Sequence, residues 1–122
     1  MEHLVSVIIP VYNVENYLQK CLDSCFSQTY TNIEVVAIND GSTDTSGEVL
    51  DEYAANEPRL KVFHQQNKGV VYARELGITS SKGEYICFVD SDDFIEKAMI
   101  SDLLQTALDG DCDIVLDFVL SS

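Results

Sequence analysis

Three short polar segments carry the side chains of this 122-residue chain that could do chemistry. Each directly follows a predicted strand: Tyr12 and Asn13 follow the first, residues 39–44 (NDGSTD) the second, and residues 90–93 (DSDD) the fourth. If the strands are parallel, all three segments meet at one edge of the sheet. Crowded carboxylates repel one another unless a cation joins them, and they suit Mg²⁺ or Mn²⁺, which also bind substrate phosphates. The pattern therefore indicates a metal-assisted diphosphate site.

Each segment also has an ordinary structural interpretation. Asp40-Gly41 alone is typical of a turn, and Asp44 would favour the start of a helix. Asp93, with Glu96 three residues further on, is a candidate helix cap. The aspartates alone therefore do not decide between a binding site and local capping.

The spacing excludes several common sites. An EF-hand loop that starts at Asp90 needs an oxygen ligand, a glycine and a glutamate at its fifth, sixth and twelfth positions. Those positions hold Phe94, Ile95 and Ser101. The chain also lacks a Walker lysine motif and a GxGxxG motif after the first strand, so ordinary P-loop and dinucleotide sites are disfavoured.

The elements that must position these groups can be predicted from hydrophobic patterning. Short β-branched runs predict strands at 4–11, 33–39, 60–64, 84–89 and 113–120. Helical spacing predicts helices over 15–28, about 46–56, 68–78 and 96–108. Asn13 is expected to cap the first helix, and Thr45-Ser46-Gly47-Glu48 has the form of a capping box for the second. This alternation predicts an α/β fold, a Rossmann-like, mostly parallel sheet with helices on both faces.

Composition limits the partners. The chain has 7 bases and 21 acids, a formal charge of 7 − 21 = −14, which argues against nucleic acid and against a polybasic contact with anionic lipid. It does not argue against phosphate bound through a metal ion. The length and a hydrophobic content of 46% fit one domain with its own core.

Cysteine usage and the absence of targeting signals bear on location. The four cysteines contain no Cys-x-x-Cys pair, so we expect buried, reduced thiols rather than a zinc site or disulfides. No apolar run approaches the length of a membrane span, and the first residues lack the basic start of a secretory signal. A cytoplasmic location is therefore the expectation.

Four motifs, taken in their order and spacing, resemble the N-terminal donor-binding half of inverting family 2 glycosyltransferases, which have the A-type, nucleotide-sugar-binding fold. The motifs are VSVIIPVYN at 5–13, INDGSTDTS at 38–46, QNKGVVYARELGI at 66–78 and FVDSDD at 88–93. The resemblance covers essentially the whole chain, and the four motifs together are highly specific.

The resemblance implies how the nucleotide base is held. Pro10, Val11 and Tyr12 are similar to the family's loop that lines the base. Asp40 matches the aspartate that hydrogen-bonds the base, usually uracil, and a carboxylate is a suitable acceptor for the imide N–H of uracil.

The resemblance also implies a phosphate and metal site. Lys68 and Gly69 match the small loop under the nucleotide, where glycine permits a close backbone approach. Arg74 matches an arginine beside the diphosphate, although an ordinary surface ion pair is the alternative for that residue. Asp90 and Asp92 match the family's Asp-x-Asp motif. Asp92 is expected to hold Mn²⁺ or Mg²⁺, and Asp90 to lie near the ribose or the metal's water shell.

The implied reaction is transfer of a sugar from a nucleotide-diphosphate donor, expected to be a UDP-sugar, to an acceptor hydroxyl with inversion. The acceptor in the full enzyme would be a saccharide or a lipid-linked molecule, as in polysaccharide biosynthesis. The full enzyme could then lie peripherally at the inner face of the cell membrane.

Two departures from the family pattern limit this expectation. Glu75 replaces the usual asparagine after the arginine, at a position expected to be peripheral. Family members also continue beyond the equivalent of Ser122, and nothing after Asp93 matches their general-base aspartate. We therefore expect residues 1–122 to be the truncated nucleotide-sugar-binding half, without the acceptor half, and to transfer little sugar. An apolar edge on a last strand at 113–120 would promote self-association.

Alternative functions remain open from the sequence. A receiver-like signalling domain shares the length, acidity and alternation, but it needs an acidic pair after the first strand, where this chain has Tyr12-Asn13. It also needs an aspartate after the third strand, where Gln65-Gln66 stand. A nucleotidyltransferase would open with a Gly-rich basic loop, which is missing here. A noncatalytic nucleotide- or metal-binding module is the remaining alternative.

Overall fold

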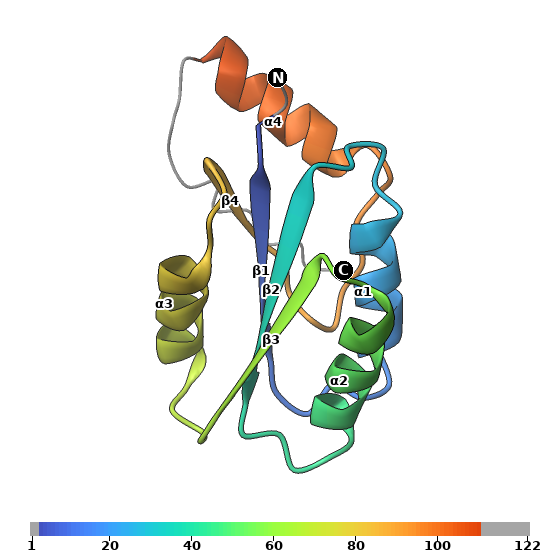
Figure 1. Ribbon diagram of the computed structural model, residues 1–122, viewed down its shortest axis with the longest axis vertical. Coiled ribbons are helices and arrows are strands. Elements are labelled where there is room, and N and C mark those ends of the chain that lie inside the picture. The colour runs from blue at the N-terminus through green and yellow to red at the C-terminus, as the bar shows by residue number, and fades with distance from the viewer. Residues whose placement is uncertain (1–2, 111–122) are drawn as a thin grey trace.

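The computed structural model describes residues 3–110 as four strands that alternate with four helices (Figure 1). The elements are β1 (Val5–Val11), α1 (Leu18–Phe26), β2 (Ile33–Asp40), α2 (Ser46–Asn56), β3 (Leu60–Gln65), α3 (Val70–Ser80), β4 (Tyr85–Phe88) and α4 (Met99–Asp109). The predicted strand at 113–120 lies outside the described residues, as does Cys112.

The strands form one parallel sheet in the order β3-β2-β1-β4. The chain runs from β1 outward to β3 and then crosses back to place β4 on the other side of β1. The order of strands therefore reverses at β1, and ligands of such sheets bind at the carboxyl ends of the strands beside that reversal. The predicted Rossmann-like α/β fold is confirmed.

Helices cover both faces of the sheet (Figure 1). Alternate residues of β1, among them Val7 and Ile9, pack in one core with α1, α2 and α4. Ile8 faces the other way and packs with Ala73 of α3. A Cβ at Gly77 would overlap the Ile8 side chain, so this glycine lets α3 lie directly on the sheet. Burial on both faces explains why the strands are nearly continuous apolar runs.

The predicted caps of the first two helices are wrong. α1 begins at Leu18, well after Asn13, whose backbone is left-handed with φ 49°. The Asn13 side chain instead accepts a hydrogen bond from the Thr43 backbone N–H at 2.8 Å. α2 begins as expected, but Thr45 makes no side-chain cap and donates its hydroxyl to Glu15. Both polar side chains connect two loops, because tertiary partners compete with local capping.

The predicted caps of the fourth helix are also wrong. α4 begins at Met99, after both Asp93 and Glu96. Asp93 instead accepts a hydrogen bond from its neighbour Phe94. Gln28 fixes the start of α4, because its amide donates to the Glu96 carbonyl at 2.6 Å and accepts from the Ile100 N–H at 3.0 Å. A side chain from just after α1 thus satisfies an N–H at the start of α4 that a local cap would otherwise satisfy.

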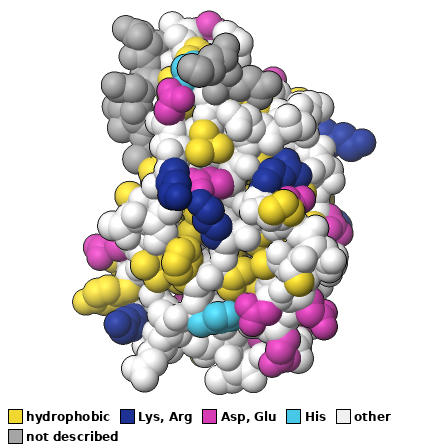
Figure 2. Space-filling model, in the orientation of Figure 1, with side chains coloured by type: hydrophobic (Ala, Val, Ile, Leu, Met, Phe, Trp, Pro, Cys, Tyr) yellow, Lys and Arg dark blue, Asp and Glu magenta, His cyan; other side chains and the backbone are white. Residues whose placement is uncertain are grey.

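The structure also places the cysteines and the surface charges. Cys21, Cys25 and Cys87 are buried free thiols, as predicted. Within residues 3–110, no helix is both long and apolar enough to cross a membrane. On the face in Figure 2, lysine and arginine side chains gather near the middle, whereas acidic side chains lie mainly toward the edges.

Candidate functional site

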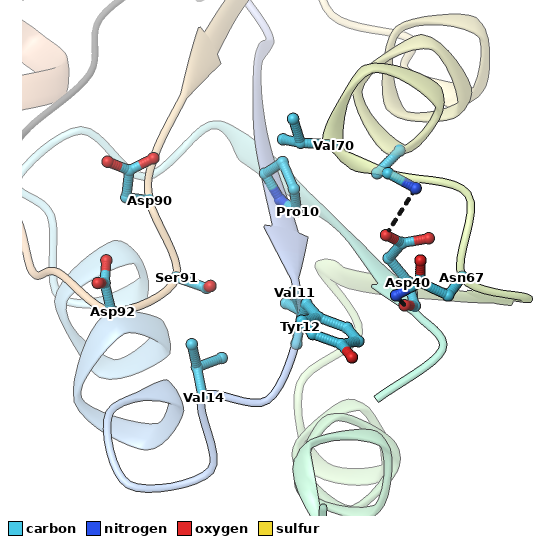
Figure 3. Close-up of a pocket in the computed structure, with 12 residues that line it drawn as sticks. Pro10, Val11, Tyr12, Val14, Asp40, Asn67, Val70, Asp90, Ser91 and Asp92 are labelled. Atoms are coloured by element: carbon cyan, nitrogen blue, oxygen red, sulfur yellow. Dashed lines mark hydrogen bonds between the residues drawn. The ribbon is translucent and has the colours of Figure 1, made fainter. Parts of the chain in front are cut away.

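A cavity of about 530 Å³ opens at the carboxyl ends of β1, β2 and β4. Two walls of different chemistry face each other across it (Figure 3). Asp40 and Asn67 lie on one side, Asp90 and Asp92 on the other, and Tyr12 lies between them. The predicted site residues that line the cavity are Pro10, Val11, Tyr12, Asp40, Gly69, Asp90 and Asp92.

Asp40 lies in the first wall, and three hydrogen-bond donors fix the position of its carboxylate. Oδ1 accepts from Gln65 Nε2 and from the Lys68 backbone N–H, each at 2.8 Å, and Oδ2 accepts from the Gly69 N–H at 3.0 Å. Asp40 is the last residue of β2, and register places Gln65 of β3 directly opposite it. Lys68 and Gly69 lie just before α3, so this carboxylate ties the start of that helix to the sheet.

These hydrogen bonds keep Asp40 ionised. Burial raises its pKa, but the bonds from Lys68, Gln65 and Gly69 together outweigh burial and leave the pKa below its ordinary value. A carboxylate oxygen can accept two hydrogen bonds. Oδ1 already has two donors, whereas Oδ2 has one among the described residues. One strong acceptor position is therefore left on a residue that lines the cavity.

Gly69 lies in the same wall and has a backbone conformation that favours glycine. Its φ is 99°, and a Cβ at this position would meet no atom within 4 Å. The backbone conformation, not crowding, is what requires glycine here. Gly41 is different, because its φ is 70° and a Cβ would also lie 2.6 Å from the Asn67 backbone nitrogen. The predicted turn at Asp40-Gly41 is thus confirmed.

Asp90, Ser91 and Asp92 form the opposite wall in the turn after β4. Asp92 is exposed and Asp90 is half-buried. Burial raises the pKa of Asp90, and the negative charges of Asp92 and Asp93 raise it further, while the charge of Arg74 opposes them. This wall therefore concentrates negative charge that nothing described neutralises fully.

Arg74 and Lys68 lie beside the cavity rather than in its lining. The Arg74 guanidinium lies over the Phe88 ring, 5.3 Å from its centroid. Its Nε is buried and has no hydrogen-bond partner among the described residues. The Lys68 side chain is exposed, and the contact of Lys68 with the site is through its backbone N–H. Glu75 is exposed on α3, as expected for a peripheral position.

The acidic wall suits a cation that is coordinated partly by the protein and partly by a substrate. Within residues 3–110, no group of three or more His, Cys, Asp or Glu side chains could hold a metal. Asp40 lies across the cavity from Asp90 and Asp92, so the three carboxylates do not form one cluster (Figure 3). Asp90 and Asp92 offer carboxylate oxygens, and Mg²⁺-type ions commonly bind through one or two carboxylates together with phosphates and water. The donor set therefore fits such an ion.

The loops after β1 and β2 are connected by hydrogen bonds that the sequence motifs did not indicate. The loop after β1 donates to the loop after β2 and to the start of α2. Ser42 Oγ accepts from the Asn13 N–H at 3.1 Å, and Ser46 Oγ, in the first residue of α2, accepts from the Val14 N–H at 3.0 Å. Asp44, besides bonding Ser46, accepts from the Glu15 N–H. The frequency of Asn, Asp and Ser in both loops was the available signal, because these side chains readily bond backbone groups.

Other cavity residues were also missed. The structure adds Val14, Asn67, Val70, Ala73 and Ser91 to the lining. Asn67 could have been found from its place beside Lys68 and Gly69 in the motif at 66–78, and in the structure its side-chain amide donates to the Asp40 carbonyl. Val70 and Ala73 line the cavity because α3 starts beside it, which depends on packing rather than on a sequence motif.

Comparison with known proteins gives a consistent result. The sequence model of the family described as "Glycosyl transferase family 2" matches residues 6–122. Glycosyltransferase GlyG of Streptococcus pneumoniae is 44% identical over 117 residues, which are 95% of this chain and 39% of GlyG. Glycosyltransferase GlyA of the same organism is 47% identical over 112 residues, 92% of this chain and 16% of GlyA. The chain thus spans less than half of each of these relatives.

The fold comparison agrees with the sequence comparison. The crystal structure of S. aureus TarS 1-349 in complex with UDP has a TM-score of 0.78 and 33% sequence identity to this chain. The similarity covers 86% of this chain and 32% of that structure. The same TarS fragment in complex with UDP-GlcNAc gives a TM-score of 0.76. Since the family match covers nearly the whole chain and the fold agrees with it, this chain belongs to glycosyl transferase family 2.

Proposed function

We propose that this chain is the nucleotide-sugar-binding half of an inverting glycosyltransferase that takes a UDP-sugar with the help of a divalent metal. The observation that carries the proposal is the cavity itself, with an acceptor on Asp40 at one wall and the acidic pair Asp90 and Asp92 at the other. TarS, which is similar in fold and sequence, has structures with UDP and UDP-GlcNAc. That similarity supports the proposal.

The wall at Asp40 would hold the base. Tyr12 is 48% exposed and lines the cavity, which leaves an aromatic surface for stacking. The single open acceptor position on Asp40 Oδ2 matches the single imide N–H of uracil. Guanine presents an N–H and an amino group side by side, and these would need two acceptors. The donor nucleotide should therefore be UDP rather than GDP.

The acidic wall and Arg74 would hold the diphosphate. Asp92, with Asp90 beside it, would bind the divalent ion, which when bound stabilises negative charge on the leaving diphosphate. Arg74 has a buried Nε without a partner among the described residues, and its positive charge would favour a phosphate near Asp90. An acceptor hydroxyl would attack the anomeric carbon in line with the departing diphosphate, with inversion. We propose that the residues that bind the acceptor and deprotonate this hydroxyl lie outside this half, at the inner face of the membrane in the full enzyme.

The test is a calorimetric titration of the 122-residue chain with UDP, with and without Mn²⁺. We expect saturable, Mn²⁺-dependent binding with a dissociation constant no weaker than about 1 mM, and weaker binding of GDP. Replacing Asp92 by alanine should remove the dependence on Mn²⁺. The matched control is D109A, which removes an exposed carboxylate from the far end of α4.

The same titration distinguishes the alternatives. A noncatalytic interaction module would show no saturable UDP binding at millimolar concentration, and D92A would then change nothing. Incubation with UDP-sugars and a hydroxyl acceptor should give little transfer by this chain alone. Efficient transfer would contradict the assignment of the general base to another part of the enzyme.

A further inference from the structure

A line of hydrogen bonds runs along the face of β2 opposite to Asp40. Asn39 precedes Asp40 and is buried, and its side chain lies between β3 and the loop after β2. Its amide nitrogen Nδ2 is 3.0 Å from His64 Nδ1, and its Oδ1 accepts from the Ser42 backbone N–H, also at 3.0 Å. On the far side of the imidazole, His64 Nε2 is 2.9 Å from a carboxylate oxygen of Asp51 on α2. The last two residues of β2 thus each hold a loop, on opposite faces of the sheet.

The partners fix the protonation of the His64 ring. Since Asn39 Oδ1 accepts from Ser42, the amide group of Asn39 presents its NH₂ to His64. His64 Nδ1 must therefore be the unprotonated acceptor, and Nε2 carries the hydrogen that is donated to Asp51. Gly47 makes room for this arrangement, because a Cβ there would lie 2.9 Å from Asn39 Nδ2. The chain Asp51–His64–Asn39–Ser42 has one consistent direction of donation.

The line of bonds continues to the cavity. Ser42 Oγ accepts from the Asn13 N–H, and Asn13 in turn accepts from Thr43. Asn13 has a left-handed backbone and directly follows Tyr12, the aromatic residue beside the cavity. The orientation of Asn39 therefore bears on the loop that carries Tyr12.

We propose that His64 is a positioning residue of the nucleotide cavity. In its Nε2–H form, which Asp51 selects, it orients the Asn39 amide and so fixes the loop after β2, Asn13 and Tyr12. His64 does not line the cavity and acts only through Asn39. The inference rests on the proposed function for the identity of the ligand, UDP.

Exposure separates this role from a general contribution to stability. The side chains of His64 and Asp51 are 46% and 63% exposed, so their pair contributes little to the folded state. Asn39, in contrast, is buried and has to keep its hydrogen bonds. Removing the acceptor at His64 should therefore act through the unpaired Asn39 amide and the loop that it holds, and not through loss of the exposed His64–Asp51 pair.

The experiment compares two replacements of opposite character, H64F and H64N. H64F keeps a ring and removes both nitrogens, whereas H64N removes the ring and keeps an acceptor at the δ position. We expect H64F to weaken UDP binding in the presence of Mn²⁺ by roughly three- to tenfold, and H64N to stay within about twofold of the wild type. If His64 only packed, the order would be reversed, because Phe fills the space and favours a strand more than Asn does.

A second pair of variants tests the selection of the ring form. D51A should weaken UDP binding in the same direction as H64F, whereas E52A, which removes the neighbouring charge on α2, should not. ¹⁵N spectra of His64 should report protonated Nε2 and unprotonated Nδ1 in the wild type. The opposite form would overturn the proposal.

Hydrogen exchange of backbone amides tests the role of His64 without depending on ligand binding. H64F should speed exchange of the Ser42 and Asn13 N–H groups relative to H64N, with or without UDP. If the wild type fails to bind UDP, the proposed function fails, and the exchange rates still decide the role of His64. Equal exchange in H64F, H64N and the wild type would contradict that role.

Discussion

Two buried carboxylates on β2 do the same structural task at opposite ends of the sheet. Glu34 and Asp40 are each 5% exposed, and they lie on the same face of the strand because six residues separate them. Asp40 accepts hydrogen bonds from the backbone just before α3, and Glu34 accepts one from Lys82, just after α3. One strand therefore holds both ends of one helix through carboxylates.

The amino end of the sheet is closed. Glu34 accepts from Ser6 Oγ and from the Lys82 backbone N–H, each at 2.5 Å, and its other oxygen pairs with Lys61 Nζ at 2.7 Å. Ser6 in turn accepts from the Gly83 N–H. Burial raises the pKa of Glu34, but the bonds from Lys61, Ser6 and Lys82 together lower it below its ordinary value.

The carboxyl end of the sheet is open. Asp40 has neutral donors and no ion pair among the described residues, and it lines a cavity of about 530 Å³. A buried, ionised carboxylate is thus no indication of function by itself. Each carboxylate has one oxygen with a single donor among the described residues, so the difference is that Asp40 has no ion pair there and lines a space large enough for a ligand, whereas Lys61 neutralises Glu34.

The largest effect on stability should come from the closed end. E34A leaves the Lys82 N–H and the Ser6 hydroxyl without their acceptor, and it should lower the free energy of unfolding by about 3 kcal/mol. UDP affinity of the folded fraction should not change. Urea denaturation followed by circular dichroism measures the loss, and E84A, at an exposed glutamate, should stay within about 0.5 kcal/mol. A loss of UDP affinity in E34A would remove the contrast between the two ends.

D40N tests the open end with a change of nearly the same size. An NH₂ group would replace one acceptor oxygen and would face donors of the loop before α3. We expect a loss of about 2 kcal/mol in stability and at least a tenfold loss of UDP affinity. Unfolding curves and calorimetry on the same samples measure both. If stability falls while UDP still binds normally, Asp40 would be a loop anchor only, like Glu34.

G69A tests the backbone that Asp40 holds. With φ at 99° and ψ at 164°, the residue lies in a region that side chains strongly disfavour. Alanine should cost about 1–2 kcal/mol and also weaken UDP binding, because the loop must shift away from Asp40. G110A is the matched control, since its φ is negative and a Cβ there would meet only ordinary contacts. Equal melting temperatures for the two variants would contradict the strain argument.

Low pH should destabilise the fold through both Glu34 and Asp40. The pKa values of Glu34 and Asp40 are lowered in the folded state, so each adds stability above the ordinary values of 4.5 and 3.8, and that stability is lost as the pH falls through the folded values. We expect the free energy of unfolding to fall below about pH 4.5, with a shallower fall in E34Q and in D40N. Urea denaturation at stepwise pH measures this, and an unchanged slope in both variants would contradict it.

The features that depend on local pattern could be predicted from the sequence. The apolar runs of the four described strands and the position of Asp40 at a strand end could be read directly, and Asp90 and Asp92 could be found in the same way. Glu34 could not be recognised, because its partners Ser6, Lys61 and Lys82 come from three distant segments that only sheet register brings together.

The cap predictions failed for a related reason. Asn13 has a type typical of a cap, and nothing local indicates that Thr43 and Asp44 will take its oxygen instead. His64 likewise looks like an ordinary polar residue of an edge strand until register places it opposite Asn39. Tertiary hydrogen bonds are the part of the site that pattern alone does not supply.

Replacing Asp90 should change the free energy of unfolding least, and it should raise that free energy where the other variants lower it. Unlike Glu34 and Asp40, its carboxylate accepts no hydrogen bond from the described residues, and burial, then the charge of Asp92, raises its pKa. An ionised group with a raised pKa costs stability above that pKa, so D90N should raise the free energy of unfolding at neutral pH by about 0.5 kcal/mol, or about 2 °C in melting temperature.

The same change should weaken UDP binding in the presence of Mn²⁺, because the acidic wall loses a charge that a cation would neutralise. Thermal unfolding and calorimetry on one preparation measure the two effects, with D109N as the control. A lower melting temperature for D90N would mean that Asp90 is anchored in the way Glu34 is. A higher melting temperature with weaker binding would mean that the charge of Asp90 destabilises the fold and strengthens binding. Such a charge at this wall would be explained by ligand binding and not by stability.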